Sequence, residues 1–137
     1  MIEEDYVSFE TAKLLKEKGF DEMCFHYWHE KDNELVHSKS PHPIRNITNP
    51  CFFGPAAPTL QMAMKWLREV HGVFISICNG NHKADNRDTS TPDDVYCFFV
   101  ITDTRALYEE EKQCLKEFSS YEEACEAAIK YCLENLI

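Results

Sequence analysis

The sequence predicts an α+β domain, in which helices pack mainly on one face of an antiparallel sheet of about four strands. Segments with apolar residues at helical spacing alternate with short runs rich in aromatic and β-branched residues. Their order along the chain is α-β-β-α-β-β-(α or β)-α. A length of 137 residues also fits one domain with a sizeable core, so we expect residues 1–137 to fold as a single unit.

The strongest helical signal covers residues 58–72. Its apolar residues recur at i, i+3, i+4, i+7 and i+10, and they are Leu60, Ala63, Met64, Leu67 and Val70. We expect Pro58 in the first turn, where a missing N–H is tolerated, and Gly72 as the left-handed residue that ends the helix. The β-prone run 73–78 follows at once, so helix and strand should form one folding unit.

A first helix is predicted within residues 8–20. Ser8 is its expected N-cap, and Gly19 stands where a Schellman ending needs a left-handed residue. The aromatic run 23–29 then reads as a strand, and 34–37 as its short return strand. The polar residues between these two runs are typical of a hairpin turn.

The second half of the chain predicts another strand over 95–101, which should pair antiparallel with 73–78 through a long loop at 79–94. Residues 104–118 are ambiguous. The spacing of their apolar residues favours a helix, and the alternative is a short edge strand that ends at Phe118.

The final helix is predicted over residues 120–136. Ser120 and Glu123 match a capping box, in which the serine caps the third helical amide and the glutamate reaches back to the N–H of the cap residue. An apolar stripe follows, and it includes Cys125 and Cys132. These two thiols are therefore expected in the core.

Composition and charge exclude some functions. The net charge is −10, with acidic ends on either side of a mildly basic middle, and this balance argues against general nucleic-acid binding. No apolar run approaches 18 residues, and the N-terminal stretch is acidic, so we expect neither a membrane span nor a signal peptide. The expected location is the cytoplasm.

The cysteines are expected to be free thiols. Their number is odd, and no two lie in a CxxC motif. They are Cys24, Cys51, Cys78, Cys97, Cys114, Cys125 and Cys132. Cys24 and His26 would share one face of a strand, but zinc needs four ligands and no second pair is evident. We expect no metal, no cofactor and no catalytic residue, since the common enzyme motifs are also absent.

The predicted strands are apolar on both faces, whereas an antiparallel sheet usually leaves one face polar. Helices can cover one face only. The aromatic residues on the other face therefore need a third helix, the proline-rich loop at 38–57 or a second molecule. The candidate interface residues are Trp28, Tyr96, Phe98, Phe52 and Phe53.

The two long loops, 38–57 and 79–94, offer a second candidate site. If the fold brings them together, their basic residues would form a cationic patch that could hold an anion. The candidate anion-binding residues are His42, Arg45, His82, Lys83 and Arg87. A pocket between the two loops, lined by this patch, would suit a ligand-binding protein or an enzyme.

Three blocks, 8–20, 57–69 and 120–136, resemble those of small uncharacterised proteins from gut anaerobic bacteria, their prophages and mobile elements. The resemblance implies a bacterial, element-borne protein, and it implies no activity. From the residues we expect a small interaction module that forms a homodimer or binds another protein. The small-ligand binder or enzyme is the alternative.

Overall fold

The computed structural model describes residues 2–38, 43–81, 95–105, 110–113 and 116–137. Within them the chain is an α+β protein with three helices and two small antiparallel sheets. The helices are α1 (Phe9–Glu17), α2 (Leu60–His71) and α3 (Tyr121–Asn135). The strands are β1 (His26–His29), β2 (Glu34–His37), β3 (Val73–Asn81), β4 (Val95–Asp103) and β5 (Glu110–Gln113).

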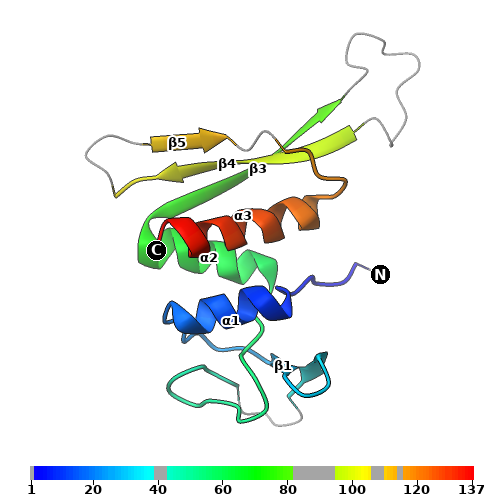
Figure 1. Cartoon of the computed structure of the whole chain (residues 1–137), viewed down its shortest axis with the longest axis vertical. Helices are drawn as coiled ribbons and strands as arrows, with labels where there is room; N and C mark the ends of the chain where they lie inside the picture. Colours follow the sequence, from blue (N-terminus) through cyan, green and yellow to red (C-terminus); the bar gives the residue numbers. More distant parts are fainter. Residues whose placement is uncertain (1, 39–42, 82–94, 106–109, 114–115) are drawn as a thin grey trace.

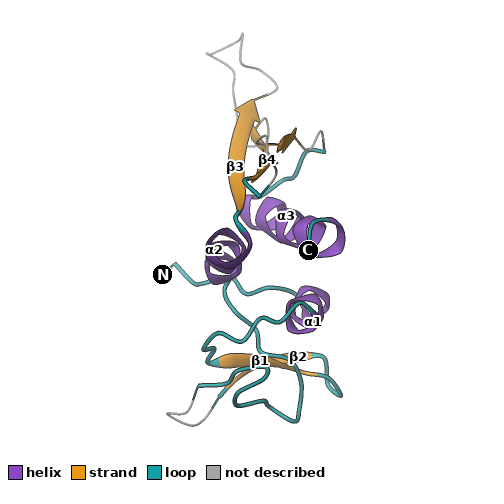
Figure 2. Ribbon diagram, turned by 90° about the vertical axis from the view of Figure 1, so that its left-hand side faces the viewer, coloured by secondary structure: helices purple, strands orange, loops and turns teal. Residues whose placement is uncertain are grey.

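The elements lie in layers along the long axis of the molecule. The sheet β3-β4-β5 lies at one end and packs on α2 and α3 (Figure 1). α1 lies beyond these two helices, and the β1-β2 hairpin lies at the other end (Figure 2). The core lies between these layers.

α1 begins and ends as its sequence predicts. The Ser8 hydroxyl accepts a hydrogen bond from the Thr11 amide at 3.2 Å. At the other end the Phe20 amide donates to the Leu15 carbonyl at 2.9 Å, and Gly19 has a φ of 91°. This is a Schellman ending, and it is closed by Phe20 and Leu15, both fully buried.

α2 confirms the predicted helix, with two differences at its ends. Thr59 is the N-cap and accepts from the Met62 amide at 3.1 Å, so Pro58 precedes the helix instead of lying in its first turn. Gly72 closes the helix with a φ of 67°, as expected. Leu67 is fully buried, but Val70 is 58% exposed, because the buried stripe ends one turn before the helix does.

α3 has half of the predicted capping box. The Ser120 hydroxyl accepts from the Glu123 amide at 3.1 Å. The Glu123 carboxylate accepts from the Ser119 hydroxyl at 2.8 Å, in place of the expected backbone N–H of the cap residue. Cys125 and Cys132 are fully buried, which confirms their predicted place in the core.

The strands form two sheets, whereas the sequence analysis expected one sheet of about four strands. β1 cannot join β3 or β4 because both of its edges are already used. β2 pairs with one edge. On the other edge the Trp28 amide donates to the Pro55 carbonyl at 3.0 Å, and the Ala57 amide donates to the His26 carbonyl at 2.9 Å. The predicted loop at 38–57 thus supplies backbone partners for β1.

The ambiguous segment 104–118 contains a strand, so the preference for a helix was wrong. β5 pairs antiparallel with the end of β4, in a register that places Ile101 opposite Lys112. Phe118 then exchanges two backbone hydrogen bonds with Cys97, each 2.8 Å long. Pairing along β4 outweighs the helical spacing of the apolar residues in this segment. Three of them, Leu107, Cys114 and Leu115, lie outside the described residues.

Candidate functional site

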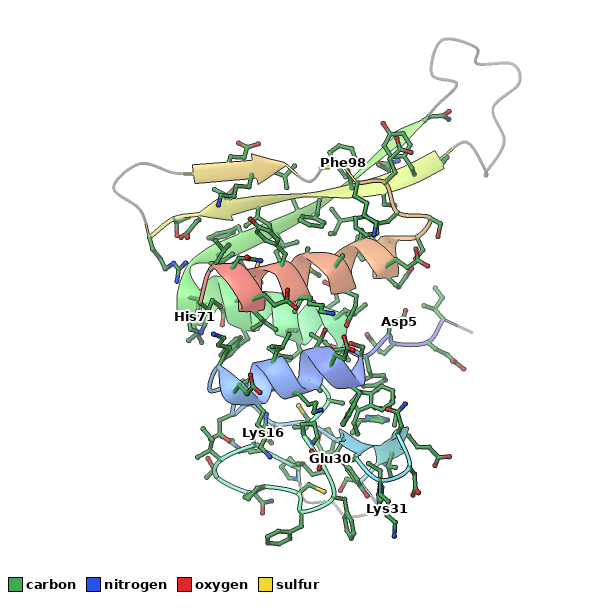
Figure 3. The ribbon with its side chains drawn as sticks, viewed as in Figure 1. Asp5, Lys16, Glu30, Lys31, His71 and Phe98 are labelled. Atoms are coloured by element: carbon green, nitrogen blue, oxygen red, sulfur yellow. The ribbon has the colours of Figure 1, made fainter. Side chains whose placement is uncertain are left out.

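The three-stranded sheet has apolar side chains on both of its faces, and only one face meets the helices. Because side chains alternate along a strand, Phe99 and Ile101 point inward, and both are buried. Figure 3 shows Phe98 on the side of the sheet away from the helices. The register places Phe74, Cys78, Tyr96, Phe98 and Val100 on that side, here called the outer face, together with Gly80 and the polar residues Ser76, Thr102 and Glu111.

The outer face carries a row of aromatic rings. The rings of Tyr96 and Phe98 lie with their centroids 6.2 Å apart, and Phe74 on the neighbouring strand is 43% exposed. Gly80 is paired with Tyr96 and leaves room for its ring, since a Cβ atom at Gly80 would lie only 2.4 Å from the Tyr96 Cζ. The Tyr96 ring therefore lies against Gly80 of β3, which has no side chain to occupy that space.

No described helix covers this face, because α2 and α3 both lie on the opposite side of the sheet (Figure 1). Tyr96, Phe98 and Val100 are each partly exposed. The part of the outer face formed by Phe74, Tyr96, Phe98 and Val100 is thus an apolar, aromatic surface in contact with solvent. The alternation of the sequence predicts this placement of Tyr96 and Phe98.

The other candidate interface residues lie elsewhere. Trp28 is turned toward the core, where its Nε1 donates to the Val7 carbonyl at 2.9 Å and its ring lies edge-on to Phe9. Phe52 is 99% exposed. Phe53 is 59% exposed and stacks on His29 with centroids 5.3 Å apart. The structure therefore does not bring these three residues together with the outer face.

Of the predicted cationic patch, Arg45 lies within the described residues. Arg45 Nη1 donates to the Asp21 carbonyl at 3.4 Å. The pKa of Asp21 is lowered, mainly by the hydrogen bond from Thr48, with a further contribution from the charge of Arg45. Arg45 thus has a local acidic partner. The other four candidates, His42, His82, Lys83 and Arg87, lie outside the described residues.

Two hollows in the described surface were not predicted. The larger, of about 490 Å³, lies between the N-terminal segment and α3, and acidic side chains such as Asp5 and Glu122 line it. Glu126 also lines it, but its carboxylate accepts hydrogen bonds from the Ser8 amide and, at 2.5 Å, from the Thr11 hydroxyl. We therefore interpret Glu126 as a structural group that holds α1 to α3.

The second hollow, of about 370 Å³, lies beside the hairpin and is lined by Tyr6, Met23, His26, His37 and Met62 among others. From the sequence, His26 was a metal-ligand candidate only together with Cys24. A signal for His37 was present, because a hairpin with its turn between 29 and 34 pairs residue 26 with residue 37.

The buried thiols are poorly suited to chemistry. Burial raises the pKa of Cys24 to about 12, that of Cys125 to about 11 and that of Cys132 to about 12. Thiolates are the reactive form, so these three cysteines are unreactive near neutral pH. Across the described residues, no three side chains of the types His, Cys, Asp and Glu gather as a metal site.

Comparisons with known proteins give no further lead: no protein family, no curated protein and no solved structure matches this chain. Of the helices that the structure describes, none has the length and apolar character needed to cross a membrane.

Proposed function

We propose that this protein is a small interaction module that self-associates through the outer face of the β3-β4-β5 sheet. The observation that carries the proposal is the aromatic row on that face. Tyr96 and Phe98 are adjacent there, Phe74 is 43% exposed beside them, and the helices cover the opposite face. Exposed apolar patches of this kind are typical of interaction sites.

The driving force would be the burial of apolar surface, which contributes about 25 cal/mol per Å². Aromatic residues near the centre of a contact usually dominate its affinity, and here these are Tyr96 and Phe98. A closed two-fold dimer is the simplest arrangement, because the same patch then covers itself on both chains. The resemblance to prophage and mobile-element proteins supports a cytoplasmic, element-borne setting for this module.

Light scattering with size-exclusion chromatography tests the proposal. We expect the wild type to be a dimer of the 16.0 kDa chain. Phe98→Glu should give a folded monomer, because an unpaired charge cannot be buried in the contact without a large cost. Phe74→Glu is a second variant on the same face, at a site that is already 43% exposed and therefore tolerant of a charge.

Phe52→Glu is the matched control, since Phe52 is 99% exposed but lies in the segment beside the hairpin. It should remain dimeric. A wild type that is monomeric at high protein concentration would overturn the proposal. A dimer that survives both substitutions on the outer face but is lost in Phe52→Glu would instead place the interface at the hairpin end.

A further inference from the structure

His26 and His37 face each other across the hairpin. They are direct partners in the register of β1 and β2. The Ser38 amide donates to the Phe25 carbonyl at 2.7 Å, so residues 25 and 38 form the hydrogen-bonded pair of the ladder. The neighbouring pair, 26 and 37, is therefore of the type without hydrogen bonds, in which opposed side chains approach most closely.

The two imidazole rings are close and available. Their centroids are 4.7 Å apart, and their planes are 87° to one another. Tyr6 lies against the other side of His26, with centroids 4.2 Å apart, and limits its movement. Burial and the nearby His37 lower the pKa of His26, which favours the neutral ring with a free nitrogen lone pair.

The surroundings of this pair supply sulfur donors. Met23 and Met62 line the same hollow of about 370 Å³, and they are 48% and 39% exposed. Long, exposed methionines are flexible enough to move their thioethers toward a ligand. Cys24 also lines the hollow, but it is only 4% exposed, so its sulfur is less accessible than the two thioethers.

The donor set discriminates between metals. A structural zinc site needs four ligands from Cys, His, Asp or Glu, and the described residues offer no group of even three. Thioethers, like thiolates, are soft ligands that favour Cu(I), and imidazole also suits copper. Two imidazoles that share one ion through nitrogens at about 2.0–2.1 Å, near a tetrahedral angle, would have centres roughly 5 Å apart. The observed 4.7 Å is close to this separation.

We infer that His26 and His37 form a Cu(I)-binding site, completed by the thioether of Met23 or Met62. The site lies at the hairpin, at the opposite end of the molecule from the outer face (Figure 1). Copper binding and self-association can therefore each fail without affecting the other.

The test is a Cu(I) titration without oxygen, in competition with a chromophoric Cu(I) chelator, of the full chain in which Cys51, Cys78, Cys97 and Cys114 are replaced by serine, because accessible thiols also bind Cu(I). We expect one ion per chain, and at least tenfold weaker binding in His26→Gln and in His37→Gln. His29→Gln is the matched control, because His29 lies on the same strand but on its other face, stacked on Phe53. It should bind as the wild type does, and circular dichroism should show all three variants folded.

Two further variants test the sulfur ligand. The double variant Met23→Leu, Met62→Leu should weaken Cu(I) binding, whereas Cys24→Ser should leave it unchanged. X-ray absorption of the loaded wild type should show both nitrogen and sulfur neighbours. Equal affinity in the wild type and both histidine variants would place the copper on thiols and overturn the inference. Tighter binding of zinc than of Cu(I) in the same competition would also overturn it.

Discussion

The backbone amide of Ser8 donates a hydrogen bond to the carboxylate of Glu126 at 3.2 Å, which joins the start of α1 to the middle of α3. The Thr11 hydroxyl donates to the same oxygen at 2.5 Å, and Thr11 is fully buried. A carboxylate at this position complements the unpaired amides and the positive end of the α1 dipole. The charge comes from a different helix, so it stabilises the packing of α1 on α3 as well as α1 itself.

The first prediction concerns this carboxylate. Glu126→Ala should lower the free energy of unfolding by about 1.5–3 kcal/mol, the range for hydrogen bonds to charged groups, because it removes the carboxylate that accepts from the Ser8 amide and the Thr11 hydroxyl. Glu126→Gln keeps an acceptor and should cost less. Glu134→Ala is the control at an exposed position of the same helix and should stay within about 0.5 kcal/mol in urea denaturation. Equal losses in Glu126→Ala and Glu134→Ala would contradict the structural role of Glu126.

The second prediction tests the helical phase of α2. Leu67 is fully buried at the centre of the core, so Leu67→Ala should cost about 2–5 kcal/mol through lost contacts and a residual cavity. Lys65, two residues earlier, is exposed, and Lys65→Ala should change stability by no more than about 0.5 kcal/mol. Thermal or urea unfolding of both variants measures the difference. Similar losses for the two would show that the phase is wrong.

The third prediction concerns Asn46, whose side chain is buried in the segment that pairs with β1. Its Nδ2 donates to the Phe20 carbonyl at 2.8 Å, and its Oδ1 accepts from the Ala56 amide at 3.0 Å. Asn46→Ala leaves both backbone groups without these partners and should cost about 1–3 kcal/mol or more. Asn49→Ala, at an exposed position nearby, should cost far less. Unfolding curves that shift equally for both would argue against the buried role of Asn46.

The fourth prediction concerns thiol labelling. Native protein at pH 8 should be labelled quickly at the partly exposed Cys51, Cys78 and Cys97. Cys125 and Cys132 should react slowly, because burial excludes the reagent and raises the pKa of both thiols. Mass spectrometry assigns each site, and labelling in denaturant gives the full set as a reference. If Cys132 were labelled as fast as Cys78, the predicted protection of the buried thiols would be wrong.

The fifth prediction is a loss of stability in mild acid. Burial lowers the pKa of His26 and of His71 from the ordinary 6.5, with His37 and Arg105 adding repulsion. Below pH 6.5 the unfolded chain then binds more protons than the folded chain, so stability that is present above pH 6.5 is lost as the pH falls through the lower folded values. Urea denaturation between pH 7 and 5.5 should show this fall.

His71→Phe separates the two contributions. The Nε2 atom of His71 is buried and has no hydrogen-bond partner among the described residues, and its ring contacts Trp66 with centroids 4.6 Å apart. A phenyl ring can keep this contact without a titrating group. The variant should therefore lose less stability on acidification than the wild type. A wild type whose stability does not change, or rises, over this pH range would refute the prediction.

Four of the helix ends could be predicted because the signals that set them are local. Ser8, Gly19, Gly72 and Ser120 each act on amides or carbonyls a few residues away, and all four stand where the sequence places them. Strand pairing is not local. The sequence shows two aromatic strands, but not that residues 55–57 occupy the edge of β1 where another strand was expected.

The candidate sites show the same division. Alternation along one strand is enough to place Tyr96 and Phe98 on one face of the sheet. The environment of Trp28 depends on a hydrogen bond to Val7, which is 21 residues away. No pattern within the strand indicates this contact. The pairing of His26 with His37 lies between these cases, because it follows from the turn position once the hairpin is assumed.

The contact between Ser8 and Glu126 also orders events during synthesis. The two residues are 118 positions apart, and a ribosome that adds 5–20 residues per second needs roughly 6–24 s to bridge them. For that time the apolar side of α1, with Ala12 and Leu15, lacks the packing that α3 provides. We therefore expect chains that stop before α3 to be bound by chaperones and cut by proteases, and the first half of the protein to become resistant only when α3, with Glu126, can pack on α1.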